Sequence, residues 1–124
     1  MQTSNNSQQR LKTITRGVWA EEQANQYLQA KGLQLITKNY RCKCGEIDLV
    51  MRQKDSIVFI EVRYRKNNIF GSAAESIDRR KQSKLIAAAK HYLQSNKITA
   101  RSPSRIDVIA ITGQTQIEWI QNAI

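Results

Sequence analysis

The chain has 124 residues, of which 40% are hydrophobic, which suits the core of one globular domain and leaves little room for a second. No stretch approaches the roughly 18 consecutive apolar residues of a membrane-spanning helix, and the polar N-terminus lacks the apolar segment of a secretory signal. We therefore expect a cytoplasmic protein without a membrane partner. It should have a flexible polar tail over residues 1–12 and a single domain over residues 13–124.

Twenty Lys and Arg residues stand against ten Asp and Glu residues, which gives a net charge of +10. The basic residues concentrate between Arg63 and Arg105, where eleven Lys or Arg accompany only two acids. An excess of this size favours a polyanionic partner such as nucleic acid, although a protein can also be basic without one. A membrane surface is disfavoured because no segment combines a basic face with a broad apolar face.

The first half of the chain predicts one helix and three strands. Apolar residues recur at helical spacing over Thr15–Lys31, and Gly32 is typical of the position just after a helix. Strands are expected over Leu33–Cys42, Glu46–Arg52 and Ile57–Arg65. The last two are rich in Val, Ile and Phe, and the polar stretch between them predicts a hairpin turn.

The second half predicts a loop over 66–76, a helix over Asp78–Ser95 and a final hairpin. The two strands of that hairpin are Arg105–Thr112 and Gln116–Ile120. The expected order is therefore α-β-β-β-α-β-β. Helices separated by runs of strands indicate the α/β class, with a mixed central sheet flanked by helices.

Cys42 and Cys44 are two positions apart, a poor spacing for a disulfide. A structural zinc site needs about four ligands, and His91 is the only further soft ligand in the chain. We expect two reduced thiols on a strand.

The turn centred between Lys54 and Asp55 sets the pairing of the strands on either side of it. An even-numbered loop pairs residues whose numbers sum to 109, which places Asp48 opposite Glu61 and Glu46 opposite Arg63. Because residues two apart on a strand share a face, these four side chains should cluster on one face. The other face is wholly apolar and should be buried; it carries Ile47, Leu49, Met51, Val58, Ile60 and Val62.

Directly opposed carboxylates have Cβ atoms about 5 Å apart and repel one another. This repulsion can be offset by one of two remedies: a structural ion pair with a neighbouring arginine, or a bound divalent cation. Mg²⁺ binds oxygen ligands from one or two carboxylates, water and substrate phosphate. Such a metal lowers the pKa of bound water, and a basic neighbour such as Arg63 can stabilise charge in the transition state. The residues alone leave both remedies open.

Asp48 followed by Glu61-Val62-Arg63 resembles the motif of PD-(D/E)XK nucleases, with Arg63 in the position of the lysine. Glu21 matches the glutamate that many of these enzymes carry on their first helix. The order of elements is also similar to their core, and archaeal-type Holliday-junction resolvases are a close architectural parallel. The resemblance implies a restriction-endonuclease-like core in which Asp48, Glu61 and Glu21 hold Mg²⁺ or Mn²⁺.

From Gly17 to Ile120 the chain more specifically resembles the YraN family of uncharacterised bacterial proteins. The resemblance is carried by ordered motifs, chiefly Gly17–Ala24, Gly45–Val50, Val58–Arg65 and Arg105–Val108. It implies a nuclease-like fold and an endonuclease role.

Arg63 departs from the nuclease motif in a way that affects the chemistry. A lysine can lose its proton and has been proposed to activate water, whereas arginine stays charged at any working pH. Arg63 can still hold a phosphate oxygen in a bidentate manner. The motif thus keeps its positive charge and loses a candidate base.

Several other side chains have two interpretations each. Glu21 and Glu22 point about 100° apart on the helix, so at most one reaches the sheet. Glu46 either supports the metal ligands from behind or pairs with Arg63. Lys81 either leans over the groove toward phosphate or is simply solvated. Asp107 is expected to have a structural role on an apolar strand.

We expect a metal-dependent endonuclease that acts on DNA, with branched or structured DNA as a candidate substrate. Two alternatives remain: a non-catalytic nucleic-acid-binding module on the same fold, and a structural protein with an ion-pair network. Junction-cutting enzymes usually act as dimers, which leaves a homodimer open. The basic residues expected to contact nucleic acid are Arg63, Arg65, Lys66, Arg79, Arg80, Lys81 and Lys84.

Overall fold

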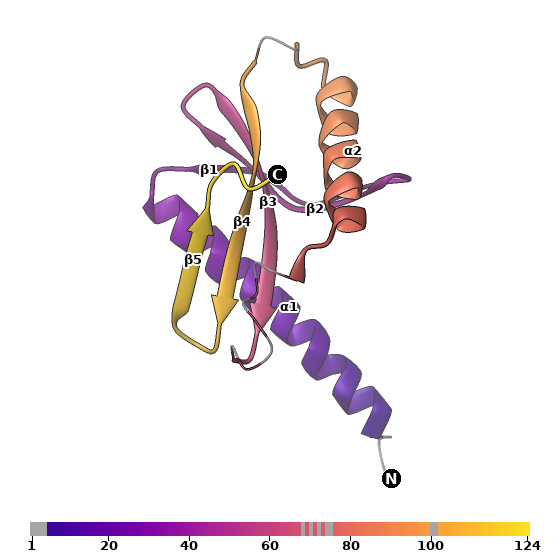
Figure 1. The fold of residues 1–124 in the computed structure, drawn as a ribbon, viewed down its shortest axis with the longest axis vertical. Coiled ribbons are helices and arrows are strands. Elements are labelled where there is room, and N and C mark those ends of the chain that lie inside the picture. The colour runs from indigo at the N-terminus through magenta and orange to yellow at the C-terminus, as the bar shows by residue number, and fades with distance from the viewer. Residues whose placement is uncertain (1–4, 68, 70, 72, 74–75, 100–101) are drawn as a thin grey trace.

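A computed structural model describes residues 5–67, 69, 71, 73, 76–99 and 102–124, with side chains from Arg16 onward. Figure 1 shows a five-stranded sheet with one helix on each side. The elements are α1 (Asn5–Ala30), β1 (Gln34–Cys42), β2 (Gly45–Gln53), β3 (Ser56–Arg65), α2 (Arg79–Ser95), β4 (Ser104–Thr112) and β5 (Gln116–Ile120). The predicted fold class and the order α-β-β-β-α-β-β are confirmed.

The strands lie in the sheet in the order in which they occur in the chain, β1-β2-β3-β4-β5. Neighbours are antiparallel except β3 and β4, which pair in parallel from Ile57–Ser104 to Arg65–Thr112. A parallel pair needs a long crossover connection, and α2 provides it. Part of the predicted loop 66–76 falls outside the described residues.

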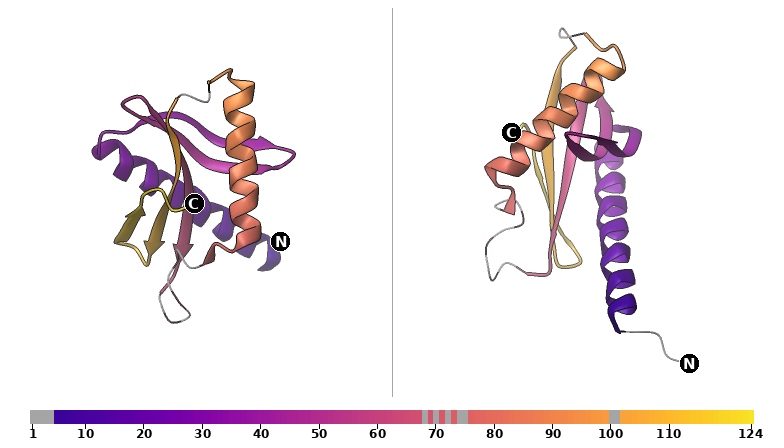
Figure 2. Two further views of the ribbon diagram at one scale, coloured as in Figure 1. Left: turned by 45° about the horizontal axis from the view of Figure 1, so that its top comes forward. Right: turned by 90° about the vertical axis from the view of Figure 1, so that its right-hand side faces the viewer.

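The sheet separates two hydrophobic cores, and the edge-on view in Figure 2 shows α1 and α2 on opposite faces. Ala20, Ala24 and Leu28 of α1 pack on the face that carries Leu49, Met51, Val58, Ile60, Ile109 and Ile111. Leu85, Ala88, Ala89 and Tyr92 of α2 pack on the face that carries Val50, Ile57, Phe59 and Ile106. Because β2 and β3 are covered on both faces, a polar side chain on them can be buried, as Glu61 of β3 is.

Helix α1 begins at Asn5, so the prediction of a start at Thr15 was wrong. Residues 5–12, expected to belong to a flexible tail, are helical. This N-terminal part of α1 is polar and carries no apolar periodicity, the signal on which the predicted start depended. Gly32, with φ of 98°, lies just after the helix as predicted, and Leu33 N donates to Leu28 O at 3.0 Å in a Schellman arrangement. No helix among the described residues is long and apolar enough to cross a membrane.

Helix α2 is anchored at its N-terminus and closely packed near its middle. Asp78 caps it by accepting a hydrogen bond from Lys81 N at 2.9 Å. The β1–β2 turn approaches the helix at Gly45, where a Cβ atom would lie 2.9 Å from the carbonyl oxygen of Lys84. Glycine permits this close approach, which fixes α2 over β2.

Candidate active site

The paired part of the β2–β3 hairpin has the predicted register. Its pairs run from Gln53–Ser56 to Leu49–Ile60, and the numbers of each pair sum to 109. Asp48 and Glu61 come next in this register, but the paired positions end before them. Instead, the Asp48 side chain reaches across to β3, where its Oδ2 accepts a hydrogen bond from Val62 N at 2.8 Å. The candidate site thus lies where β2 separates from β3.

Asn39 on β1 lies beside this separation and has a left-handed backbone, with φ of 53°. The β1–β2 register passes from Lys38–Leu49 directly to Tyr40–Ile47, without a pair at Asn39 and Asp48. The regular alternation of side chains changes at this point. Ile47 therefore packs in the α2-side core rather than with Leu49 and Met51, and the prediction that these three share a face was wrong for Ile47.

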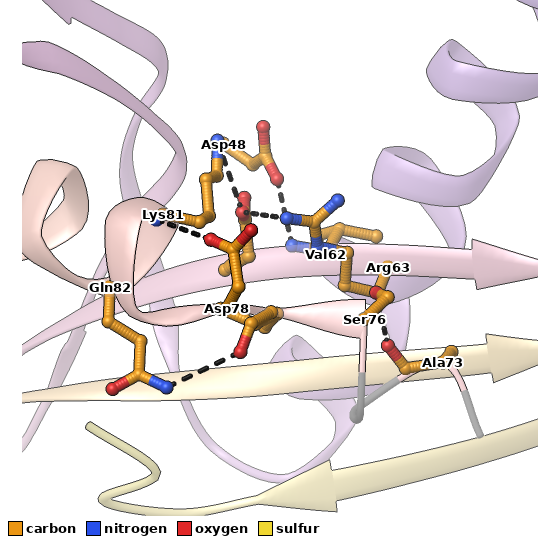
Figure 3. A network of polar contacts seen from close by, with 10 residues as sticks. Asp48, Val62, Arg63, Ala73, Ser76, Asp78, Lys81 and Gln82 are labelled. Atoms are coloured by element: carbon orange, nitrogen blue, oxygen red, sulfur yellow. Dashed lines mark hydrogen bonds and ion pairs between the residues drawn. The ribbon is translucent and has the colours of Figure 1, made fainter. Parts of the chain in front are cut away.

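Glu61 is buried next to two cations and another carboxylate. Its side chain is 4% exposed, and its Oε2 lies 3.3 Å from Lys81 Nζ and 3.4 Å from Arg63 Nη2. These are ion-pair distances, but Oε2 forms no hydrogen bond with any residue that the structure describes. Figure 3 shows Asp48, Arg63 and Lys81 pointing toward the same space.

The pKa of Glu61 is raised to about 8, first by burial and then by the hydrogen bond and the negative charge of Asp48, while the charges of Lys81 and Arg63 act in the opposite direction. A carboxyl group beside a second carboxylate is expected to keep its proton, because two negative charges at close range repel each other. At neutral pH, the Glu61 carboxyl group therefore retains its proton. A metal ion held by Asp48 and Glu61 could replace that proton.

Glu21, rather than Glu22, faces the site. Burial and then the charge of Asp48 raise the pKa of Glu21, which places it in the electrostatic field of the carboxylate pair. Glu22 points elsewhere and pairs with Lys38 at 3.1 Å. The described residues contain no group of three His, Cys, Asp or Glu side chains arranged to hold a metal. The structure therefore brings together Asp48 and Glu61 as a candidate ligand pair and leaves Glu21 as a nearby charge.

Glu46 does not join this group. Its carboxylate pairs with Arg41 at 3.3 Å on an exposed part of the hairpin, rather than with Arg63 or behind Asp48. The change of alternation at Asp48 explains the difference, because Glu46 and Asp48 no longer follow the two-residue repeat on which the prediction depended.

The basic residues divide into two groups. Arg63 and Lys81 are partly buried, and both reach Glu61. The others expected to contact nucleic acid are exposed: Arg65, Lys66, Arg79, Arg80 and Lys84. The close approach of Lys81 was one of two open interpretations of the sequence. Asn39 was missed, although an asparagine inside a strand is a recognisable signal, since this residue tolerates the left-handed region.

Cys42 and Cys44 are free thiols, with their sulfur atoms 2.7 Å apart at the β1–β2 turn. They contact each other, and the described residues supply no further ligands that would make a zinc site with them.

Comparison with known proteins identifies the family. The profile of the uncharacterised protein family UPF0102 matches residues 20–111. A UPF0102 protein of Saccharophagus degradans is 52% identical over 107 residues, which cover 86% of this chain and 90% of the relative. Relatives in Pseudomonas fluorescens (53% over 105 residues; 84% and 88% covered) and Nitrosomonas eutropha (51% over 111 residues; 90% and 94% covered) carry the same family name. The family resemblance expected from the sequence motifs is thus confirmed: the chain belongs to the bacterial UPF0102 family.

Proposed function

We propose that this protein is a metal-dependent phosphodiesterase that cuts DNA in the cytoplasm, with branched or structured DNA as its substrate. One observation carries the proposal. The buried Glu61 carboxyl group meets Asp48 where β2 separates from β3, between the cations Lys81 and Arg63. Two acidic and two cationic side chains converge in one partly buried space. Phosphoryl transfer requires such a set, because the acids can hold a metal ion and the cations can hold a phosphate.

The donor atoms of the site fit a hard divalent cation. Glu61 Oε2 is buried and has cations at ion-pair distance but no hydrogen bond from any described residue, so its capacity to accept one is unused and is available to a metal ion. Asp48 is fixed by its hydrogen bond from Val62 N, so its carboxylate is held in place before a cation binds. Asp48 and Glu61 would hold Mg²⁺ or Mn²⁺ with water completing the shell, and Glu21 would add negative charge nearby. The bound cation would lower the pKa of a water ligand and offset charge on the scissile phosphate.

Lys81 supplies a lysine at the site, although Arg63 stands at the lysine position of the nuclease motif. The ammonium group that the motif places two residues after the glutamate is supplied here from α2, 3.3 Å from Glu61 Oε2. The two cations can divide the work, since a guanidinium matches a phosphate in a bidentate manner and an ammonium group is a compact point charge. In this proposal Arg63 binds a phosphate oxygen through its guanidinium, and the Lys81 ammonium group orients the attacking water.

The charge of the chain supports nucleic acid as the partner. Arg65, Lys66, Arg79, Arg80 and Lys84 are exposed, and the chain carries a net charge of +10. Basic residues of this kind bind phosphates without regard to sequence, and the binding weakens steeply with salt. They would guide the DNA backbone toward Glu61, while the carboxylate pair sets where it is cut.

The test is cleavage of a junction, a flap and a linear duplex with and without Mg²⁺. Wild-type protein should cut at least one branched DNA only when Mg²⁺ is present, and Asp48→Asn should slow cleavage about a thousandfold, or about 4 kcal/mol. Asp55→Asn, the same chemical change on the exposed β2–β3 turn, should leave the rate unchanged. Equal activity of wild type and Asp48→Asn would contradict the proposal.

Arg63 in the lysine position favours one alternative, a non-catalytic nucleic-acid-binding module on the same fold. That alternative predicts salt-sensitive binding with no cleavage of any substrate. It also predicts that Asp48→Asn binds slightly more tightly, since a negative charge is removed. The same set of DNA substrates distinguishes the two functions.

A further inference from the structure

A cavity lies at the end of β3 beside Tyr64, which is three residues and so about 10 Å along the strand from Glu61. It has a volume of about 750 Å³ and opens between α1, the end of β3 and the β4–β5 turn. Figures 1 and 2 show that this turn and the end of β3 lie alongside α1 at the same end of the sheet. The cavity is on the α1 side of the sheet, whereas Lys81 approaches Glu61 from α2.

Two aromatic rings form the apolar wall of this cavity. Trp19 and Tyr64 contact each other edge to face, with ring centroids 5.8 Å apart and an interplanar angle of 90°. Both are partly buried because they pack against the α1-side core, and both line the cavity. Rings held in this way present a rigid surface on which a planar group can stack at little entropic cost.

The polar lining of the cavity selects for an anion. Arg16 and Lys66 supply two positive charges, and no carboxylate occurs among the described residues that line it. Gln23 and Gln114 add side-chain amides that can both donate and accept hydrogen bonds. A ligand that is planar, hydrogen-bonding and negatively charged matches this lining, and a nucleotide has all three properties.

We propose that this cavity holds the base of an unpaired nucleotide in a DNA strand whose backbone continues to the Asp48–Glu61 site. The inference rests on the proposed function and specifies its substrate as DNA with a single-stranded segment. The spacing of about 10 Å along the β3 backbone equals about three stacked nucleotides at roughly 3.4 Å each. Because Glu21 of α1 also faces the Asp48–Glu61 site, a strand on the α1 side can reach from the cavity to that site. The base stacks on Trp19 or Tyr64, and Arg16 and Lys66 bind the phosphates of the same nucleotide.

The test compares two DNAs with equal numbers of phosphates, a blunt duplex and a duplex with a single-stranded thymidine tail. Binding is measured by fluorescence anisotropy in EDTA, so that cleavage does not contribute. Wild-type protein should bind the tailed DNA about tenfold more tightly, the effect of one base stacked on an aromatic ring. Tyr64→Ala or Trp19→Ala should abolish this preference and leave blunt-duplex affinity unchanged, whereas Tyr64→Phe should retain it. A preference that is absent, or that survives loss of both rings, would overturn the inference.

Two further measurements keep the inference testable if a ring variant fails to fold. In wild-type protein the thymidine tail should quench tryptophan fluorescence through Trp19, and the blunt duplex should not; equal quenching by both would count against the site. Free thymidine monophosphate should displace the tail only weakly. If it binds as tightly as the tailed DNA, the cavity is a mononucleotide site and the strand proposal is wrong.

The outcomes separate this inference from the catalytic proposal. A tail preference without Mg²⁺-dependent cleavage would support the cavity and reject the phosphodiesterase. Cleavage without a tail preference would do the reverse.

Discussion

Glu61 and Asp107 are buried carboxylic acids on the neighbouring strands β3 and β4, yet their surroundings are opposite. Asp107 is fully buried and accepts hydrogen bonds from Arg105 Nε at 3.0 and 3.1 Å, Trp119 Nε1 at 2.9 Å and Asn122 N at 2.8 Å. Glu61 is 3% exposed and faces another carboxylate, and its Oε2 has Lys81 and Arg63 at ion-pair distance but no hydrogen bond from the described part of the chain. Only the environment of Asp107 supplies hydrogen-bond donors to both oxygens of the carboxylate.

The difference indicates which acid is structural and which is available for chemistry. A carboxylate with donors on both oxygens is held in place and stabilises the fold around it. Asp107 in this way ties β4 to Trp119 of β5 and to Asn122. A carboxyl group that is buried without such donors is costly, and sites of this kind occur where a protein binds a ligand or carries out a reaction.

The largest effect is expected from Asp107→Ala. The substitution leaves the Arg105 guanidinium buried without its anion, and breaking a buried ion pair from one side costs about 3–5 kcal/mol. Urea denaturation should show this loss in the free energy of unfolding. A loss below about 1 kcal/mol would mean that the Asp107 network is not structural.

Lys81→Gln should reduce the rate of DNA cleavage about a hundredfold, since one preorganised charged donor at the reacting centre is typically worth that much. DNA affinity should change little, because Lys81 is one of many cations. Lys90→Gln removes an exposed lysine from the same helix and is the matched control. If both variants cleave at the same rate, Lys81 has no part in the reaction.

Glu61→Gln should make the protein more stable in alkaline solution. Because the pKa of Glu61 is raised to about 8 in the folded state from an unfolded value of 4.5, folding retains a proton that the unfolded chain releases. The stabilisation of the folded state by this retained proton is complete below pH 4.5, declines as pH rises and is lost above pH 8. Glutamine cannot ionise, so the variant should match wild type near pH 4 and exceed it by at least about 2 kcal/mol at pH 9. If the free energies of unfolding of wild type and Glu61→Gln change in parallel across this pH range, the pKa of Glu61 is not raised.

Glu46→Gln should have the smallest effect. Glu46 forms an exposed ion pair with Arg41, and pairs of this kind contribute about 0–1 kcal/mol. Stability should change by less than about 0.5 kcal/mol, and the rate of cleavage should be unaltered. A large loss of cleavage would mean that Glu46 supports the metal ligands, one of the two roles that the sequence left open.

The sequence could predict what depends on local periodicity. The polar turn 53–56 between two strongly apolar strands was enough to set the register as far as Leu49–Ile60. The same alternation identified Asp48 and Glu61 as neighbours. The buried surroundings of Asp107 also followed from its place on an apolar strand, although its partners Trp119 and Asn122 could not be assigned in advance.

Features set by three-dimensional packing could not be predicted in this way. The separation of β2 from β3 depends on the left-handed Asn39 and on a hydrogen bond from Val62 N to a side chain, and neither alters hydrophobic alternation in the sequence. The contact of Lys81 with Glu61 depends on the rotation of α2, which Asp78 and Gly45 help to fix. The positions predicted for Glu46 and Ile47 were wrong for one reason, the change in side-chain alternation at Asp48.

Anomalous diffraction from crystals soaked in Mn²⁺ would show whether Asp48 and Glu61 hold a metal ion. We expect a peak between the carboxylates of Asp48 and Glu61 in wild-type crystals, absent from crystals of Asp48→Asn, and no peak at Asp107. Saturating Mn²⁺ without a peak at Asp48 and Glu61, with both side chains in place, would contradict a metal-dependent site.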